Sequence, residues 1–77
     1  MMDKMADWPA SRLKSELRKL LRRQKAFELR AKGESWQAIA QALHTSPANA
    51  SIFCLSYSKA RLAAVQALLE DKEIGIG

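Results

Sequence analysis

Apolar positions in the first half of the chain recur at alternating steps of three and four, the spacing of one face of an α-helix. This stripe consists of Leu13, Leu17, Leu20, Gln24, Phe27 and Ala31, and Leu21 and Leu29 widen it. No helix-breaking residue interrupts the segment, and Asp7 or Ser11 would cap its start, with Pro9 in the first turn. The pattern therefore predicts a long first helix over residues 9–32.

A second, shorter apolar pattern predicts a helix over residues 35–43. Gly33 would end the first helix, because glycine adopts the left-handed conformation at little cost. Ser35 would then cap the new helix. Its buried side would contain Trp36, Ile39, Ala40 and Leu43.

The third predicted helix begins at Ser46, where a capping hydroxyl precedes Pro47 at the first helical position. His44 and Thr45 would form the turn, and Ala40 is small enough for the two helices to approach closely. Two helices joined by so short a turn form a helix-turn-helix, expected here over residues 35–58.

The segment after Ser46 has no clear helix stop before Asp71, so either one long helix or a break near residues 56–58 fits the sequence. One apolar stripe would close the helix-turn-helix core and comprises Ala50, Phe53, Cys54 and Tyr57. Another has heptad spacing and comprises Ile52, Leu55, Lys59, Leu62, Gln66 and Leu69, with Val65 and Leu68 beside it.

This second stripe is left over once the first has closed the core, and so much apolar surface is unusual in water. We therefore expect a homodimer. Its interface would use Leu13, Leu17, Leu20, Leu62, Val65 and Leu69. The alternative is that the stripe folds back onto the leucines of the first helix within one chain.

The charge distribution is uneven, although the net charge is only +5. Nine of the thirteen Lys and Arg residues lie between positions 12 and 32, against two Glu residues. A basic segment beside a helix-turn-helix favours a polyanionic partner. We expect one all-α domain over 1–77, with a flexible N-terminus at 1–8, a basic helix at 9–32, the helix-turn-helix at 35–58, a helical extension at 59–70 and a flexible tail at 71–77.

Other chemistry finds little support in the sequence. The single His44 has no second histidine or carboxylate at metal-ligand spacing, and the single Cys54 is more typical of a small buried residue than of a nucleophile. No run of 18 apolar residues occurs. We expect a cytoplasmic protein without enzymatic activity, cofactor, metal or membrane contact.

Residues 24–43 read QKAFELRAKGESWQAIAQAL, with the order leucine, spacer, Gly-x-Ser-aromatic, Ile-Ala and Leu before the turn and serine. This segment resembles the helix-turn-helix of sigma-factor region 4 and of resolvase and transposase DNA-binding domains, which are homeodomain-like. The resemblance covers roughly residues 24–58. The chain departs from the pattern at His44, where the family usually has glycine, and at Ala50, where it usually has a β-branched residue. The third helix also lacks the usual arginine or lysine.

The resemblance implies a small DNA-binding transcriptional regulator, a dimeric repressor whose third helix enters the major groove of double-stranded DNA. In this interpretation Asn49 would pair with an adenine edge, and Ala48 or Ile52 would contact a thymine methyl group. Ser46 and Ser51 lie near the same groove-facing end. The expected set is completed by Arg22, Arg23, Lys25, Arg30, Ser35 and Gln37, which would hold phosphates, and by Lys59.

The alternative is a protein-interaction module of the antitoxin or anti-activator type, which uses a helix-turn-helix to bind a second protein. Its support is the apolar character of Ile52 and Leu55, at positions where a DNA-reading helix usually carries polar side chains.

Overall fold

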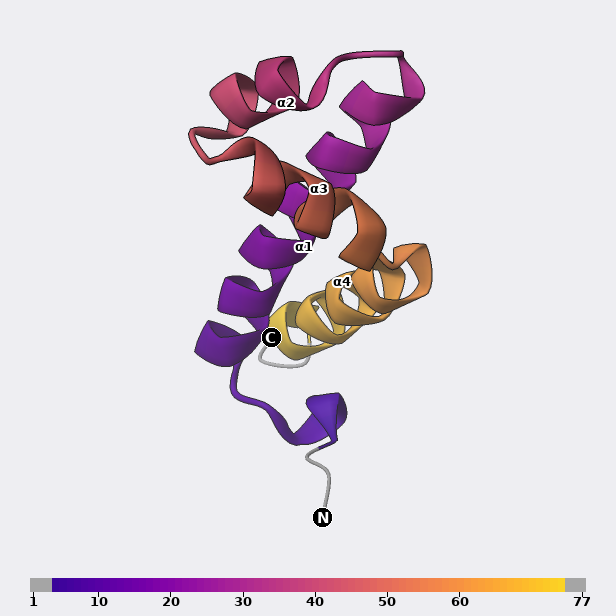
Figure 1. Ribbon diagram of the computed structural model, residues 1–77. Helices are drawn as coiled ribbons and strands as arrows, with labels where there is room; N and C mark the ends of the chain where they lie inside the picture. The colour runs from indigo at the N-terminus through magenta and orange to yellow at the C-terminus, as the bar shows by residue number, and fades with distance from the viewer. Residues whose placement is uncertain (1–3, 75–77) are drawn as a thin grey trace.

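The computed structural model describes residues 4–74 and confirms the all-α prediction (Figure 1). Its elements are a short 3-10 helix, η1 (Met5–Asp7), and the α-helices α1 (Ala10–Ala31), α2 (Trp36–Leu43), α3 (Pro47–Ser56) and α4 (Lys59–Ile74). Helix α1 contacts each of the other three α-helices, and η1 packs against α4. No strand occurs in the described part of the chain.

Helix α1 matches the predicted long helix, but the predicted cap is wrong. The N-cap residue is Pro9, which makes no side-chain capping bond, and its carbonyl accepts from the backbone N–H groups of Arg12 and Leu13 at 3.1 Å each. Asp7 lies in η1 instead. Trp8 packs against the cluster that includes Leu13, at the spacing of a hydrophobic staple, and the Arg12 guanidinium lies 4.0 Å from the centre of its ring. Apolar packing thus fixes this helix start.

The two caps of the helix-turn-helix are confirmed. The Ser35 hydroxyl accepts from the N–H of Ala38 at 3.1 Å, and the Ser46 hydroxyl accepts from the N–H of Asn49 at 3.2 Å. Gly33 has the expected positive φ, at 92°. These bonds satisfy backbone donors that a helix start leaves without intrahelical partners.

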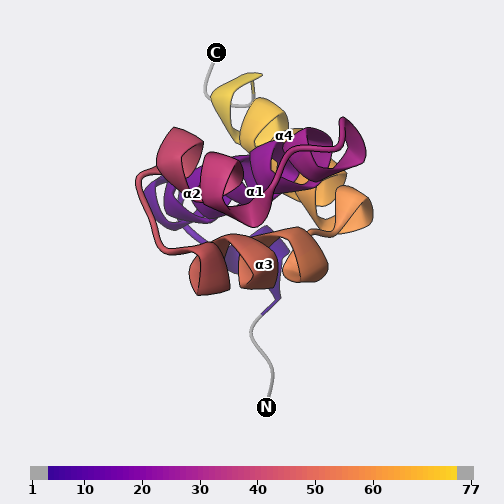
Figure 2. The ribbon, with the colours of Figure 1, turned by 45° about the horizontal axis from the view of Figure 1, so that its top comes forward.

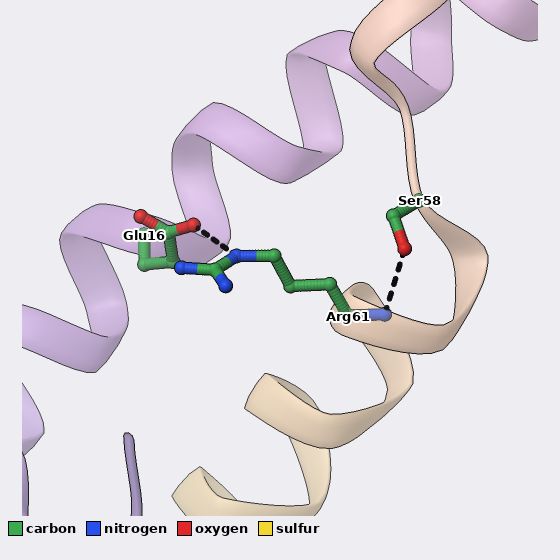
Figure 3. A network of polar contacts seen from close by, with 3 residues as sticks. All are labelled: Glu16, Ser58 and Arg61. Atoms are coloured by element: carbon green, nitrogen blue, oxygen red, sulfur yellow. Dashed lines mark hydrogen bonds and ion pairs between the residues drawn. The ribbon is translucent and has the colours of Figure 1, made fainter. Parts of the chain in front are cut away.

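The helical conformation is interrupted between α3 and α4. Of the two possibilities that fitted the sequence, the structure therefore has two separate helices and not one long helix. Tyr57 is extended, and the Ser58 hydroxyl accepts from the N–H of Arg61 at 3.2 Å, starting a new helix at a bend of 76°. Arg61 also reaches back to α1, where its Nε donates to a Glu16 carboxylate oxygen at 2.8 Å (Figure 3). No single described helix has the length and apolar character to cross a membrane; only the bent pair α3 and α4 would pass that test together.

The break makes the predicted heptad stripe wrong, because its two ends face different surroundings. On α3, Ile52 and Leu55 remain 58% and 82% exposed. On α4, Leu62 and Leu69 turn inward and are buried against the N-terminal half of α1. The residues of this leucine cluster are Leu13, Leu20, Leu62, Val65 and Leu69, with Leu17 and Leu68 packed against it.

The leucine cluster corrects the expected dimer interface. The six residues assigned to that interface, Leu13, Leu17, Leu20, Leu62, Val65 and Leu69, all lie in or against this cluster within one chain. These side chains are covered by α1 and α4 within one chain, so this particular stripe does not need a second copy to bury it. The leftover stripe folds back within the chain, as the alternative required.

A second core, the alanine cluster, joins the C-terminal half of α1 to α2 and α3. Its buried members are Ala26, Ile39, Ala40 and Ala50, and Leu29, Trp36, Leu43, Phe53 and Cys54 pack against them. The predicted contact between the inner side of the third helix and the second helix is therefore confirmed, except that Tyr57 packs against the leucine cluster.

The two ends of the chain carry more structure than expected. Residues 5–7 form η1, within the segment expected to be flexible, and α4 continues through residues 71–74 of the expected tail. Residues 1–3 and 75–77, for which flexibility was also expected, lie outside the described residues.

Candidate nucleic-acid interface

Helix α3 lies along one edge of the molecule, and Figure 2 shows α1, α2 and α4 all on the same side of it. The side facing away from them is exposed. This outer face of α3 consists of Ala48, Asn49, Ile52, Leu55 and Ser56. The opposite side of the helix is held in place by the buried Ala50. The fold therefore leaves this side of α3 exposed to solvent.

Local hydrogen bonds order the polar groups of α3. The Asn49 side-chain amide donates to the Thr45 hydroxyl at 3.2 Å, and the Ser46 hydroxyl caps the helix. The Ser56 hydroxyl turns back to the helix and donates to the carbonyls of Ile52 and Phe53, at 2.7 and 3.3 Å. Of the expected groove-facing residues, Ala48, Asn49 and Ile52 are thus well exposed, whereas Ser46 is occupied as a cap.

A basic cluster on α1 borders this helix. Lys19, Arg22 and Arg23 line a pocket together with Phe53 of α3. Asn49 lies four residues before Phe53 and Ser56 lies three residues after it, so both are neighbours of Phe53 on the helix surface. The pocket therefore adjoins the outer face of α3. Positive charge on one helix and an open face on another are thereby joined into one surface.

Arg22 has a structural role within this cluster. Its guanidinium donates to the carbonyl of Leu43 at 2.6 Å and lies 5.3 Å from the centre of the Phe53 ring. Leu43 ends α2, where carbonyl groups lack intrahelical donors and a cation is favourable. Arg22 therefore ties α1 to the last turn of α2, while Lys19 and Arg23 carry the charge beside it.

The other predicted DNA-binding residues lie elsewhere. Arg30 donates to the carbonyl of Glu34 at 2.9 Å and stacks 4.5 Å from the centre of the Trp36 ring, next to the start of α2. Ser35 caps that helix and Gln37 is exposed in its first turn. The remaining predicted positions are Lys25, exposed on α1, Lys59, exposed at the start of α4, and Ser51, half-buried on α3.

The predicted DNA-binding set omits three residues of this surface: Lys19, Leu55 and Ser56. Lys19 is detectable, because it stands four positions before Arg23 and such residues share one face of a helix. Leu55 belongs to the predicted heptad stripe, which would be correct only for a continuous third helix. Ser56 enters the sequence reasoning only as a helix-weakening residue.

The rest of the described structure offers no competing chemical centre. Across residues 4–74, no three His, Cys, Asp or Glu side chains gather as a metal site requires. Cys54 is half-buried in the alanine cluster and His44 is exposed in the turn. The surface formed by α3 and the basic cluster is accordingly the best-defined candidate site.

Comparisons of this chain with protein-family models, with curated proteins and with solved structures gave no match.

Proposed function

We propose that this protein is a small regulator of transcription that binds double-stranded DNA, with α3 in the major groove and the basic cluster on the adjoining phosphates. The observation that carries the proposal is the position of Lys19 and Arg23 beside an α3 whose outer face no other described helix covers. A major groove admits one α-helix, and cations at its edge neutralise the backbone.

In this proposal a single copy of the chain binds the DNA. Because the leucine cluster is covered within one chain, the proposed binding mode does not require the homodimer that the apolar pattern predicts. One copy would place one helix in one stretch of groove. Its affinity would come largely from phosphate contacts and would fall steeply with salt.

The test is a salt series of binding to a duplex of random sequence, with two matched double variants. Lys19→Gln with Arg23→Gln removes two charges beside α3. Lys14→Gln with Arg18→Gln removes two exposed charges from positions five residues earlier, rotated by about 140° around the same helix. The first pair should lower the slope of log K against log salt by about two units, at ~0.9 for each phosphate that is no longer neutralised.

The control pair should leave that slope nearly unchanged. Equal reductions for both pairs would show that charge anywhere on α1 suffices, which would contradict the assigned surface. An absence of binding by the parent chain at low salt would overturn the proposal as a whole.

The second candidate function is a protein-interaction module of the antitoxin or anti-activator type. The specific observation in its favour is the exposure of Ile52 and Leu55. The failure of the parent chain to bind duplex DNA in the salt series would favour this function.

A further inference from the structure

The outer face of α3 is apolar to a degree that constrains what it can read. Ala48, Ile52 and Leu55 follow one another at steps of four and three, forming one exposed stripe along the helix. Ile52 is 58% and Leu55 82% exposed. None of these side chains is needed by either hydrophobic cluster.

The polar groups on the same face are few. Helix α3 contains no charged residue, so it lacks the Arg or Lys side chain that most often recognises guanine in the major groove. The Ser56 hydroxyl uses its proton on backbone carbonyls of its own helix. The Asn49 amide donates to Thr45, which leaves its second N–H and its carbonyl oxygen for a ligand.

We infer that the outer face of α3 reads A·T base pairs, chiefly through the C5-methyl groups of thymine. This inference rests on the proposed DNA-binding function. In the major groove an A·T pair presents the thymine methyl group, which apolar side chains contact, and the adenine N6 and N7 atoms, which suit an Asn side chain. Ala48, Ile52 and Leu55 supply the first kind of contact, and Asn49 supplies the second.

In this proposal the two helices of the surface have different roles in DNA binding. The basic cluster on α1 contributes affinity that does not depend on sequence, and α3 contributes preference for methyl-bearing base pairs. The two contributions are separable by mutation, because Ile52 and Leu55 lie on α3 whereas Lys19 and Arg23 lie on α1.

The experiment begins with sites selected by the parent chain from random duplex DNA. Each selected duplex is then prepared in two forms, one with thymine and one with uracil in its place. Uracil keeps the base-pairing edge and lacks only the methyl group. At fixed salt the uracil form should bind about fourfold more weakly for each thymine methyl group that the protein buries, the effect of exposing one CH₂-sized group.

Two variants distinguish the contributions. Ile52→Ala with Leu55→Ala should lower the thymine-to-uracil affinity ratio to the part that Ala48 alone supplies, and thermal melting should show an intact fold, since both side chains are exposed. Lys19→Gln with Arg23→Gln should weaken both forms alike and leave the ratio unchanged. This double dissociation is the expected result.

The failure of the inference and the failure of the proposed function give different outcomes. A parent chain that binds both forms equally, or that selects guanine-rich sites, would overturn methyl reading while leaving DNA binding in place. A parent chain that binds no duplex at low salt would overturn the DNA-binding function itself, and the inference with it.

Discussion

The two hydrophobic clusters of this protein share α1 but differ in the size of the side chains that fill them. The leucine cluster joins the N-terminal half of α1 to α4 with long side chains, all at most 6% exposed. The alanine cluster joins the C-terminal half of α1 to α2 and α3, and three of its four buried members are alanine. One core depends on volume and the other on close approach.

Because of this difference, the leucine cluster contributes mainly to the stability of the fold, and the alanine cluster mainly to the placement of α3. Each fully buried leucine contributes roughly 1.5–3 kcal/mol relative to exposure, so the leucine cluster supplies much of the burial that a small domain needs. Alanines contribute less burial, but they let helix backbones pack at short distance. The alanine cluster therefore sets where α3 lies relative to Lys19 and Arg23, on which the proposed DNA surface depends.

Truncation in the leucine cluster should have the largest effect. Leu20→Ala removes a side chain with no exposure, and should lower the free energy of unfolding by ~2–5 kcal/mol through the cavity it leaves. Leu21→Ala is the matched control, because Leu21 is the next residue and is 41% exposed. It should change stability by about 0.5 kcal/mol or less.

Urea denaturation of both variants measures these differences, and repeating it across protein concentrations sharpens the comparison. A leucine cluster formed within one chain gives a midpoint that does not depend on concentration. A midpoint that rises with protein concentration would indicate that the leucine cluster is stabilised by association of two chains, and would contradict its assignment to one chain.

Enlargement in the alanine cluster should have the next largest effect. Ala50→Leu inserts a bulky group where α3 contacts its neighbours at zero exposure, and should cost ~1–3 kcal/mol through overpacking. Ala48→Leu makes the same chemical change on the outer face of α3, where the added side chain meets solvent. Thermal melting should show a clear decrease for Ala50→Leu and little change for Ala48→Leu. Equal tolerance at both positions would mean that close approach is not what Ala50 provides.

The sequence predicted the alanine cluster more accurately than the leucine cluster, for a physical reason. Gly33 ends a helix, and Ser35 and Ser46 cap backbone N–H groups three residues ahead of them, so their roles can be predicted from the local sequence. The pairing of α1 with α4 depends on whether the chain turns at Tyr57 and Ser58, and the serines there are compatible with either outcome. Without that turn, the same leucines would require a second copy of the chain.

The candidate surface was predictable to a similar extent. The uneven charge pointed to Arg22 and Arg23, and the resemblance to helix-turn-helix domains implied that Asn49 and Ile52 face outward. The structural role of Arg22 within the basic cluster was not predictable, because its hydrogen bond to the Leu43 carbonyl joins residues 21 positions apart. Contacts of that range depend on how three helices meet, which local patterns do not determine.

The smallest predicted effect concerns the turn that orients α3 against α2. His44 adopts the left-handed conformation, with φ 55° and ψ 49°, which glycine adopts at lower steric cost. A residue with a Cβ atom is less stable in that conformation by roughly 1–2 kcal/mol, and glycine recovers part of this but loses more backbone entropy on folding. His44→Gly should therefore raise stability by ~0.5–1 kcal/mol, which corresponds to a few degrees in melting temperature for a domain of this size. His44→Asn, which tolerates the left-handed region, should fall between the two, and His44→Ala should gain nothing. A lower stability in His44→Gly would show that the imidazole holds the turn through contacts of its own, and the alanine cluster would then share control of the position of α3 with that side chain.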